Sequence, residues 1–163
     1  MIELLLPKQI LPPDLMQWAY IAGGYAACPA LASDIDVWVQ VKEGQLVNTR
    51  IQILQWLESN MWPFKAEDNE GPLSDTYVAG VLKVAIVTSP HLSHPVHIIV
   101  TESTPIQQLE LFDISTHQIA LTWGGVVKGS QWKSIFEPPK VMIEMPRTAT
   151  RLAKLTKRYG GNR

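Results

Sequence analysis

The sequence has a single cysteine, Cys28, so it cannot form an intramolecular disulfide. One unpaired thiol fits a reducing compartment, and the position of Cys28 in a run of small residues indicates a packing role. No apolar run is long enough to span a membrane. Residues 1–6 are too short and too acidic for a signal peptide. We therefore expect a cytoplasmic protein that does not enter membranes.

The chain also lacks an excess of either charge, with 14 Lys and Arg against 15 Asp and Glu. The formal net charge of -1 gives no sign that the whole protein binds nucleic acid. Residues 147–163 differ from the rest because they are basic and contain no acid. We find no internal repeat and no low-complexity tract. A length of 163 residues is enough for one domain with a proper core, so we predict a single domain over residues 1–163.

Periodicity and turn residues predict alternating strands and helices. We expect helices at residues 25–32, 48–62, 104–112 and 148–159. Asn48 or Thr49 would cap the second of these, with Ile51, Leu54, Leu57 and Met61 on its apolar face. We expect strands at residues 18–22, 33–41, 77–87, 96–101 and 118–123. Residues 65–74 read as an exposed acidic loop, and residues 126–145 as irregular.

The most informative stretch joins a glycine pair, Gly23 and Gly24, to an Asp-x-Asp sequence, Asp34 and Asp36. Side chains alternate along a strand, so Asp34 and Asp36 should lie on one face, with Ile35 directed into the core. Two carboxylates on one strand face are costly unless a cation neutralises them. Oxygen ligands suit Mg²⁺, which usually recruits substrate phosphates as further ligands. The simpler alternative is a solvated hairpin whose aspartates cap a turn.

This block resembles the signature of the polymerase-beta-like nucleotidyltransferase superfamily, in which a glycine pair, a short helix and a strand with Asp-x-Asp follow one another. The resemblance covers about residues 15–102. It implies an α/β (α+β) fold with a mixed, mostly antiparallel sheet flanked by helices. It also implies transfer of a nucleotide from a nucleoside triphosphate to a hydroxyl on an RNA end, a protein or a small molecule. Asp34 and Asp36 would hold Mg²⁺ or Mn²⁺, while Gly23, Gly24 and Ser33 would bind phosphate.

The sequence departs from the family where a third carboxylate is expected. That position falls in an apolar-acid-apolar strand, which here is Val96-His97-Ile98. Glu102 would point to the opposite face of this strand by alternation. Asp113 follows a helix, and nothing in its position aims it at the metal. His97 therefore stands in the place of the third acid.

Three interpretations of His97 stay open. The imidazole serves as a ligand or as a base toward the attacking hydroxyl, or the protein uses a single metal on Asp34 and Asp36. In the third, catalysis is lost and the domain only binds RNA or a partner protein. We favour an enzyme because both aspartates and both glycines are present. A zinc site at the histidines is not expected, since no cysteine pair supports His91, His94, His97 and His117.

The basic C-terminal segment is predicted to form an amphipathic helix over about residues 147–163. Its cations are candidates for contact with an RNA backbone or a triphosphate, although the charge pattern by itself favours a solvated helix face. These residues are Arg147, Arg151, Lys154, Lys157 and Arg158. Trp38 falls on the aspartate face of its strand, where it would either stack on a base or be partly buried in the sheet.

Overall fold

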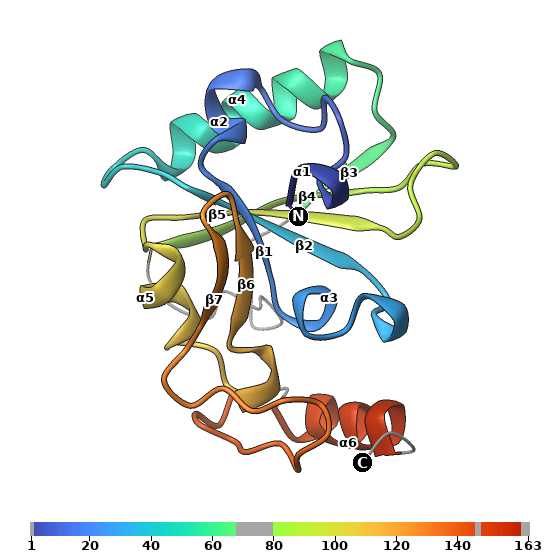
Figure 1. The fold of residues 1–163 in the computed structure, drawn as a ribbon. Helices are drawn as coiled ribbons and strands as arrows, with labels where there is room; N and C mark the ends of the chain where they lie inside the picture. The colour runs from blue at the N-terminus through green and yellow to red at the C-terminus, as the bar shows by residue number, and fades with distance from the viewer. Residues whose placement is uncertain (1, 68–79, 146–147, 161–163) are drawn as a thin grey trace.

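The computed structural model describes residues 2–67, 80–145 and 148–160 (Figure 1). The chain forms a mixed α/β structure around one seven-stranded sheet of order β3-β4-β5-β2-β1-β6-β7. Every neighbouring pair of strands is antiparallel except β2 and β5. The strands are β1 (Ala19–Ala22), β2 (Ile35–Gln40), β3 (Phe64–Ala66), β4 (Val81–Val87), β5 (Val96–Thr101), β6 (Ile119–Thr122) and β7 (Gly125–Lys128). This confirms the prediction of a mixed, mostly antiparallel sheet.

The helices lie on both sides of the sheet, with α2 and α4 on one side and α3 and α6 on the other (Figure 1). They are α1 (Ile2–Leu5), α2 (Pro13–Met16), α3 (Gly24–Ala27), α4 (Leu46–Ser59), α5 (Pro105–Leu109) and α6 (Thr148–Tyr159). Two 3₁₀ turns, η1 (Pro29–Leu31) and η2 (Ser115–His117), complete the described elements. None of the helices in the described part of the chain has the length and apolar character needed to cross a membrane.

Strand alternation divides the sheet into an apolar face and a polar face. On β2, Val37 and Val39 are fully buried in the main core. α4 packs over β4 and β5 on this face and contributes Ile53 and Leu57 to the same core. Asp36, the residue before Val37, is therefore turned toward the other face, as the alternation predicts. That second face carries the polar site.

The predicted boundaries of α4 and its buried face were wrong in part. The helix begins at Leu46, two residues before the predicted start, and has Gln45 at its N-cap, with no side-chain cap hydrogen bond. Thr49, which we expected at the cap, is buried inside the helix, whereas Ile51 and Met61 are 45% and 88% exposed. Apolar side chains occur all round this helix, so the hydrophobic pattern does not select one face. Packing against β4 and β5 determines which face of α4 is buried.

Two further expectations differ from the structure at turns. The helix expected at residues 25–32 is divided into α3 and η1, because Cys28 between them has extended backbone with φ -159°. The irregular stretch expected after residue 125 begins with β7, which pairs with β6 as a hairpin. Much of the predicted acidic loop and the start of the strand predicted at residues 77–87 lie outside the described residues.

A small second core attaches α6 to the rest of the molecule. Leu155 and Tyr159 of α6 are buried against Ile114, and Cys28 packs against this cluster from the side. Cys28 is a free cysteine that is partly buried. Its contact with the cluster agrees with the packing role inferred from its small-residue surroundings. Because this small core holds α6 in place, one side of the basic helix lies at the polar face of the sheet.

Candidate functional site

A cleft of about 490 Å³ lies on the polar face of the sheet. Its walls come from β2, β4 and β5, the turn before α3, the segment after α5, and α6. The cleft brings together most of the residues predicted as site residues, although they are separated by up to 135 positions in the chain. Those lining it are Gly23, Gly24, Ser33, Asp34, Asp36, His97, Arg151, Lys154 and Arg158.

The glycine turn leads directly from β1 into α3. Gly23 has φ 89° and ψ -145°, a conformation that is essentially restricted to glycine. A Cβ at Gly23 would lie 3.5 Å from Oδ2 of Asp36, which is an ordinary van der Waals contact. The positive φ, rather than crowding, therefore restricts this position to glycine, and the turn brings the backbone close to Asp36.

The aspartates and His97 come from the two parallel strands at the centre of the sheet. Asp36 on β2 is in register with His97 on β5, so both side chains lie on the cleft face. His97 Nε2 is 3.6 Å from Oδ2 of Asp34, which immediately precedes β2. The structure thus places His97 beside the Asp-x-Asp pair, in the position from which a third carboxylate would face the same space.

The carboxylate of Asp36 is partly buried and lies close to other charges. Burial, followed by repulsion from Asp34, raises the pKa of Asp36 to about 6. Electrostatic interactions with His97, Arg151 and Lys83 act in the opposite direction and do not cancel the rise. A bound cation would relieve the repulsion, and the two carboxylates offer the all-oxygen donor set that suits Mg²⁺.

Only a partial metal-binding set is present, however. In the described ranges, no three or more His, Cys, Asp or Glu side chains are grouped so as to hold a metal ion. Mg²⁺ is commonly held by one or two carboxylates together with substrate phosphates and water. The pair Asp34 and Asp36 therefore fits a metal that arrives with a phosphorylated ligand.

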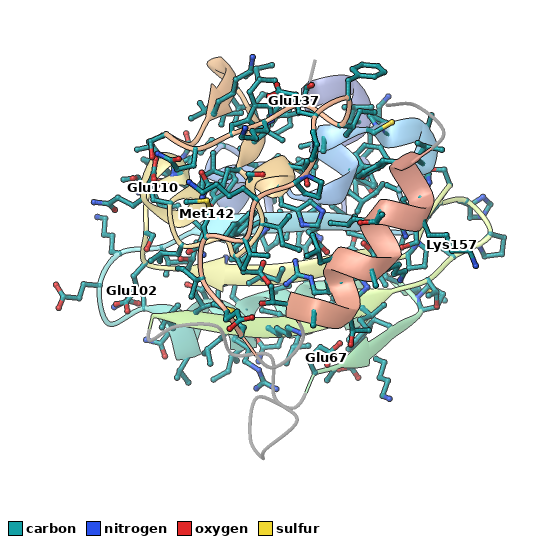
Figure 2. The ribbon with its side chains drawn as sticks, turned by 90° about the horizontal axis from the view of Figure 1, so that it is seen from below. Glu67, Glu102, Glu110, Glu137, Met142 and Lys157 are labelled. Atoms are coloured by element: carbon teal, nitrogen blue, oxygen red, sulfur yellow. The ribbon has the colours of Figure 1, made fainter. Side chains whose placement is uncertain are left out.

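Glu102 does not join Asp34 and Asp36 in the cleft. It accepts a hydrogen bond from the Gly44 backbone N–H at 2.7 Å and lies at the edge of the molecule, away from α6 (Figure 2). The alternation argument, which turned Glu102 away from His97, agrees with this placement. Glu67, by contrast, lines the cleft just after β3, near one end of α6 (Figure 2). The loop prediction for residues 65–74 places Glu67 in solvent, and no local pattern indicates that β3 brings it to the cleft.

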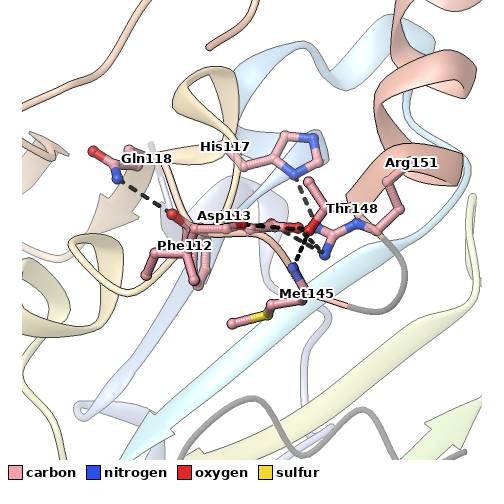
Figure 3. A network of polar contacts seen from close by, with 8 residues as sticks. Phe112, Asp113, His117, Gln118, Met145, Thr148 and Arg151 are labelled. Carbon is pink, nitrogen blue, oxygen red and sulfur yellow. Dashed lines mark hydrogen bonds and ion pairs between the residues drawn. The ribbon is translucent and has the colours of Figure 1, made fainter. Parts of the chain in front are cut away.

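The carboxylate of Asp113 contacts α6. Its Oδ1 is 3.2 Å from Nη1 of Arg151, and its Oδ2 accepts a hydrogen bond from the Thr148 hydroxyl at 2.8 Å (Figure 3). The Thr148 hydroxyl in turn accepts from the Met145 backbone N–H. This buried network fixes the start of α6 and the direction of Arg151.

His117 is a site residue that the sequence analysis missed. The same Arg151 donates from Nη2 to Nδ1 of His117 at 3.3 Å (Figure 3). His117 is 92% buried, and this burial together with Arg151 and Arg158 lowers its pKa to about 3. The ring is therefore neutral at physiological pH. The sequence suggested only that it belonged to a group of four histidines, and the structure does not gather those four into a metal site.

The basic helix presents a subset of its predicted cations to the cleft. Arg151, Lys154 and Arg158 line it, and their spacing places them on one side of α6. Lys157 points outward from the helix and is exposed (Figure 2). Arg147 lies outside the described residues. Ser33 lines the cleft entrance and is exposed.

Trp38 forms part of the cleft floor and is 3% exposed. Its ring is stacked on Tyr20, with centroids 6.3 Å apart, and packs against Phe112 at 5.5 Å. Since both neighbours are aromatic, Trp38 is part of the sheet packing and is not an open platform for a base. Burial was the second of the two roles expected for it.

Comparison with known proteins adds no assignment: no protein-family model matches the chain, and no curated protein has a matching sequence.

Proposed function

We propose that the protein is a Mg²⁺-dependent nucleotidyltransferase of the polymerase-beta-like type, which moves a nucleoside monophosphate from a nucleoside triphosphate to a hydroxyl. The observation that carries the proposal is the meeting of three features in one cleft. These are the glycine turn, the Asp34 and Asp36 pair, and the cationic side of α6. A triphosphate needs close backbone approach, a divalent cation and positive charge, and each feature supplies one of them.

Each set of residues has a distinct role in this proposal. Asp34 and Asp36 hold Mg²⁺, which would neutralise charge on the phosphates and polarise the phosphoryl group. The backbone at Gly23 and Gly24 receives the phosphate groups. Lys154 and Arg158 lie across the cleft and offset the remaining negative charge of the triphosphate. Ser33 hydroxyl donates to a phosphate oxygen at the cleft entrance.

The reaction forms a bond from the attacking hydroxyl oxygen to the α-phosphorus and breaks the bond to the oxygen that bridges to the β-phosphate. Pyrophosphate leaves, and the hydroxyl proton goes to a base. His97 is the candidate base because it stands beside Asp34 on the cleft face. An imidazole within reach of the attacking hydroxyl can accept its proton as a general base.

The second candidate is a silent domain of the same fold that binds RNA or a partner protein. The observation in its favour is that His97 takes the position of the third carboxylate, next to Asp36 in the strand register. A domain of this kind would use the cations of α6 without needing the aspartates. Metal dependence separates the two candidates.

Calorimetric titration with each nucleoside triphosphate, in the presence and absence of Mg²⁺ or Mn²⁺, tests the proposal. We expect binding that requires the metal and is abolished in Asp34→Asn/Asp36→Asn. Asp14→Asn is the matched control, because Asp14 is an exposed aspartate paired with Gln52 at α4 and lies outside the cleft. Binding that persists without metal and in the double variant would favour the silent domain. No triphosphate binding at all would contradict the proposal.

A further inference from the structure

The side chain of His117 presents a hydrogen-bond donor in a fixed direction. Arginine can only donate, so the contact from Arg151 Nη2 makes Nδ1 of His117 the acceptor. In a neutral ring the proton must then reside on Nε2. Asp113 holds Arg151 on its other side, which fixes both the tautomer and the orientation of the imidazole (Figure 3).

The donor on Nε2 has no acceptor among the residues that the structure describes. Nε2 is buried and makes no hydrogen bond. A buried donor without an acceptor costs about 1–3 kcal/mol, so the fold retains an unfavourable group here. The Nε2–H group is thus held in a fixed direction without a hydrogen-bond acceptor from the described part of the protein.

Nε2 faces the glycine turn at the start of α3. It lies 3.8 Å from the position that a Cβ on Gly24 would occupy, and both residues line the cleft. A buried donor that faces this turn and has no acceptor of its own among the described residues can donate to an anion bound there.

We propose that His117 binds a phosphate group of the ligand, donating from Nε2 to an oxygen that is also held at the Gly23–Gly24 turn. This inference deepens the proposed function, because it assigns His117 to the phosphate chain of the nucleotide. The neutral ring contributes direction rather than charge. It therefore selects a phosphate position without adding a titratable cation beside Asp36.

Two substitutions of His117 test the hydrogen-bonding roles of its two ring nitrogens separately. In His117→Asn the amide oxygen replaces Nδ1 and still accepts from Arg151, but the Nε2 donor is lost. In His117→Gln the amide nitrogen replaces Nε2 and keeps the donor, while the Nδ1 acceptor is lost. His91→Asn is the control, since His91 is exposed in the turn between β4 and β5, outside the cleft.

The probe is inorganic pyrophosphate, titrated without divalent metal and followed by NMR on protein labelled with ¹⁵N-histidine. We expect the free protein to show the Nε2–H tautomer of His117, and the Nε2 proton to shift when pyrophosphate is added. His117→Asn should weaken binding at least about tenfold, the loss typical of one hydrogen bond to a charged group. His117→Gln should stay within about threefold of the wild type, and His91→Asn should bind as the wild type does.

Several results would overturn the inference. An Nδ1–H tautomer, unchanged binding in His117→Asn, or no pyrophosphate binding by the wild type would each do so. Equal weakening in His117→Asn and His117→Gln would show that His117 only positions Arg151. The proposed function fails separately: if pyrophosphate binding requires His117 but triphosphate binding ignores Mg²⁺ and the two aspartates, the anion site stands and the transferase does not.

Discussion

Replacing Asp36 by Asn should stabilise the ligand-free protein while it removes metal-dependent binding. Burial and the neighbouring Asp34 raise the pKa of Asp36 from 3.8 to about 6. One pKa unit corresponds to about 1.4 kcal/mol, so the ionised side chain costs the folded state up to about 3 kcal/mol. Asp36 keeps some solvent contact. We therefore expect Asp36→Asn to gain about 2 kcal/mol in the free energy of unfolding at pH 7.5.

The pH dependence gives this prediction its sign. Between pH 4 and pH 6 the folded protein binds more protons at Asp36 than the unfolded chain does, because the folded pKa is the higher one. The contribution of Asp36 to stability therefore falls as the pH rises through this window. Below about pH 4 both states are protonated, and the advantage of Asp36→Asn should disappear. Above about pH 6 the stability advantage of Asp36→Asn over the wild type should be constant.

Urea denaturation in the presence of EDTA, at intervals from pH 4 to pH 8, measures the effect. Asp14→Asn is the control and should follow the wild-type curve, since Asp14 is exposed and outside the cleft. An equal gain at pH 4 and pH 7.5, or a loss of stability at pH 7.5, would refute the reasoning. Adding Mg²⁺ should then stabilise the wild type and leave Asp36→Asn unchanged, because a cation that binds only the folded state shifts the equilibrium by mass action.

Three other substitutions test the geometry of the cleft. His97→Asp should place a third carboxylate beside Asp36 and tighten Mg²⁺ binding at least about tenfold, seen as a larger Mg²⁺-induced rise in Tm; an unchanged rise would remove His97 from the metal position. Gly23→Ala should lower the free energy of unfolding by about 1–3 kcal/mol in urea, because alanine is strained at φ 89°, and full stability would contradict the described turn. Lys154→Gln should weaken triphosphate binding about three- to tenfold in calorimetry, whereas Lys157→Gln, on the outward side of α6, should not; equal effects would show that the charge acts nonspecifically.

The sequence predicted the centre of the sheet well because strand alternation is a local rule. The period of two placed Asp34 and Asp36 on one face and turned Glu102 away from His97, and the structure confirms both. The glycine turn was also predictable, since a change from an apolar run to Gly-Gly marks a bend. These features depend only on neighbouring residues.

The features of the site that the sequence did not predict depend on contacts between residues far apart in the chain. Asp113 and Arg151 are 38 positions apart, and no local pattern says that they will pair. His117 acquires its tautomer from that pair, so its role was not readable from a sequence in which it resembled three other histidines. Glu67 entered the cleft through the edge strand β3, which has only three residues. The buried face of α4 was likewise set by the sheet, since its apolar residues point in several directions.

The position of α6 explains how opposite charges share one cleft without cancelling each other. Asp113 takes the ion pair of Arg151, and the small core around Leu155 and Tyr159 holds the rest of the helix. The helix is therefore docked by contacts of its own, and its docking does not require the Asp34 and Asp36 pair. Among the described residues, Asp36 makes no ion pair with α6, and its pKa stays raised. The cleft thus keeps an acidic side and a basic side apart, which is the arrangement that a bound metal and a polyphosphate together would neutralise.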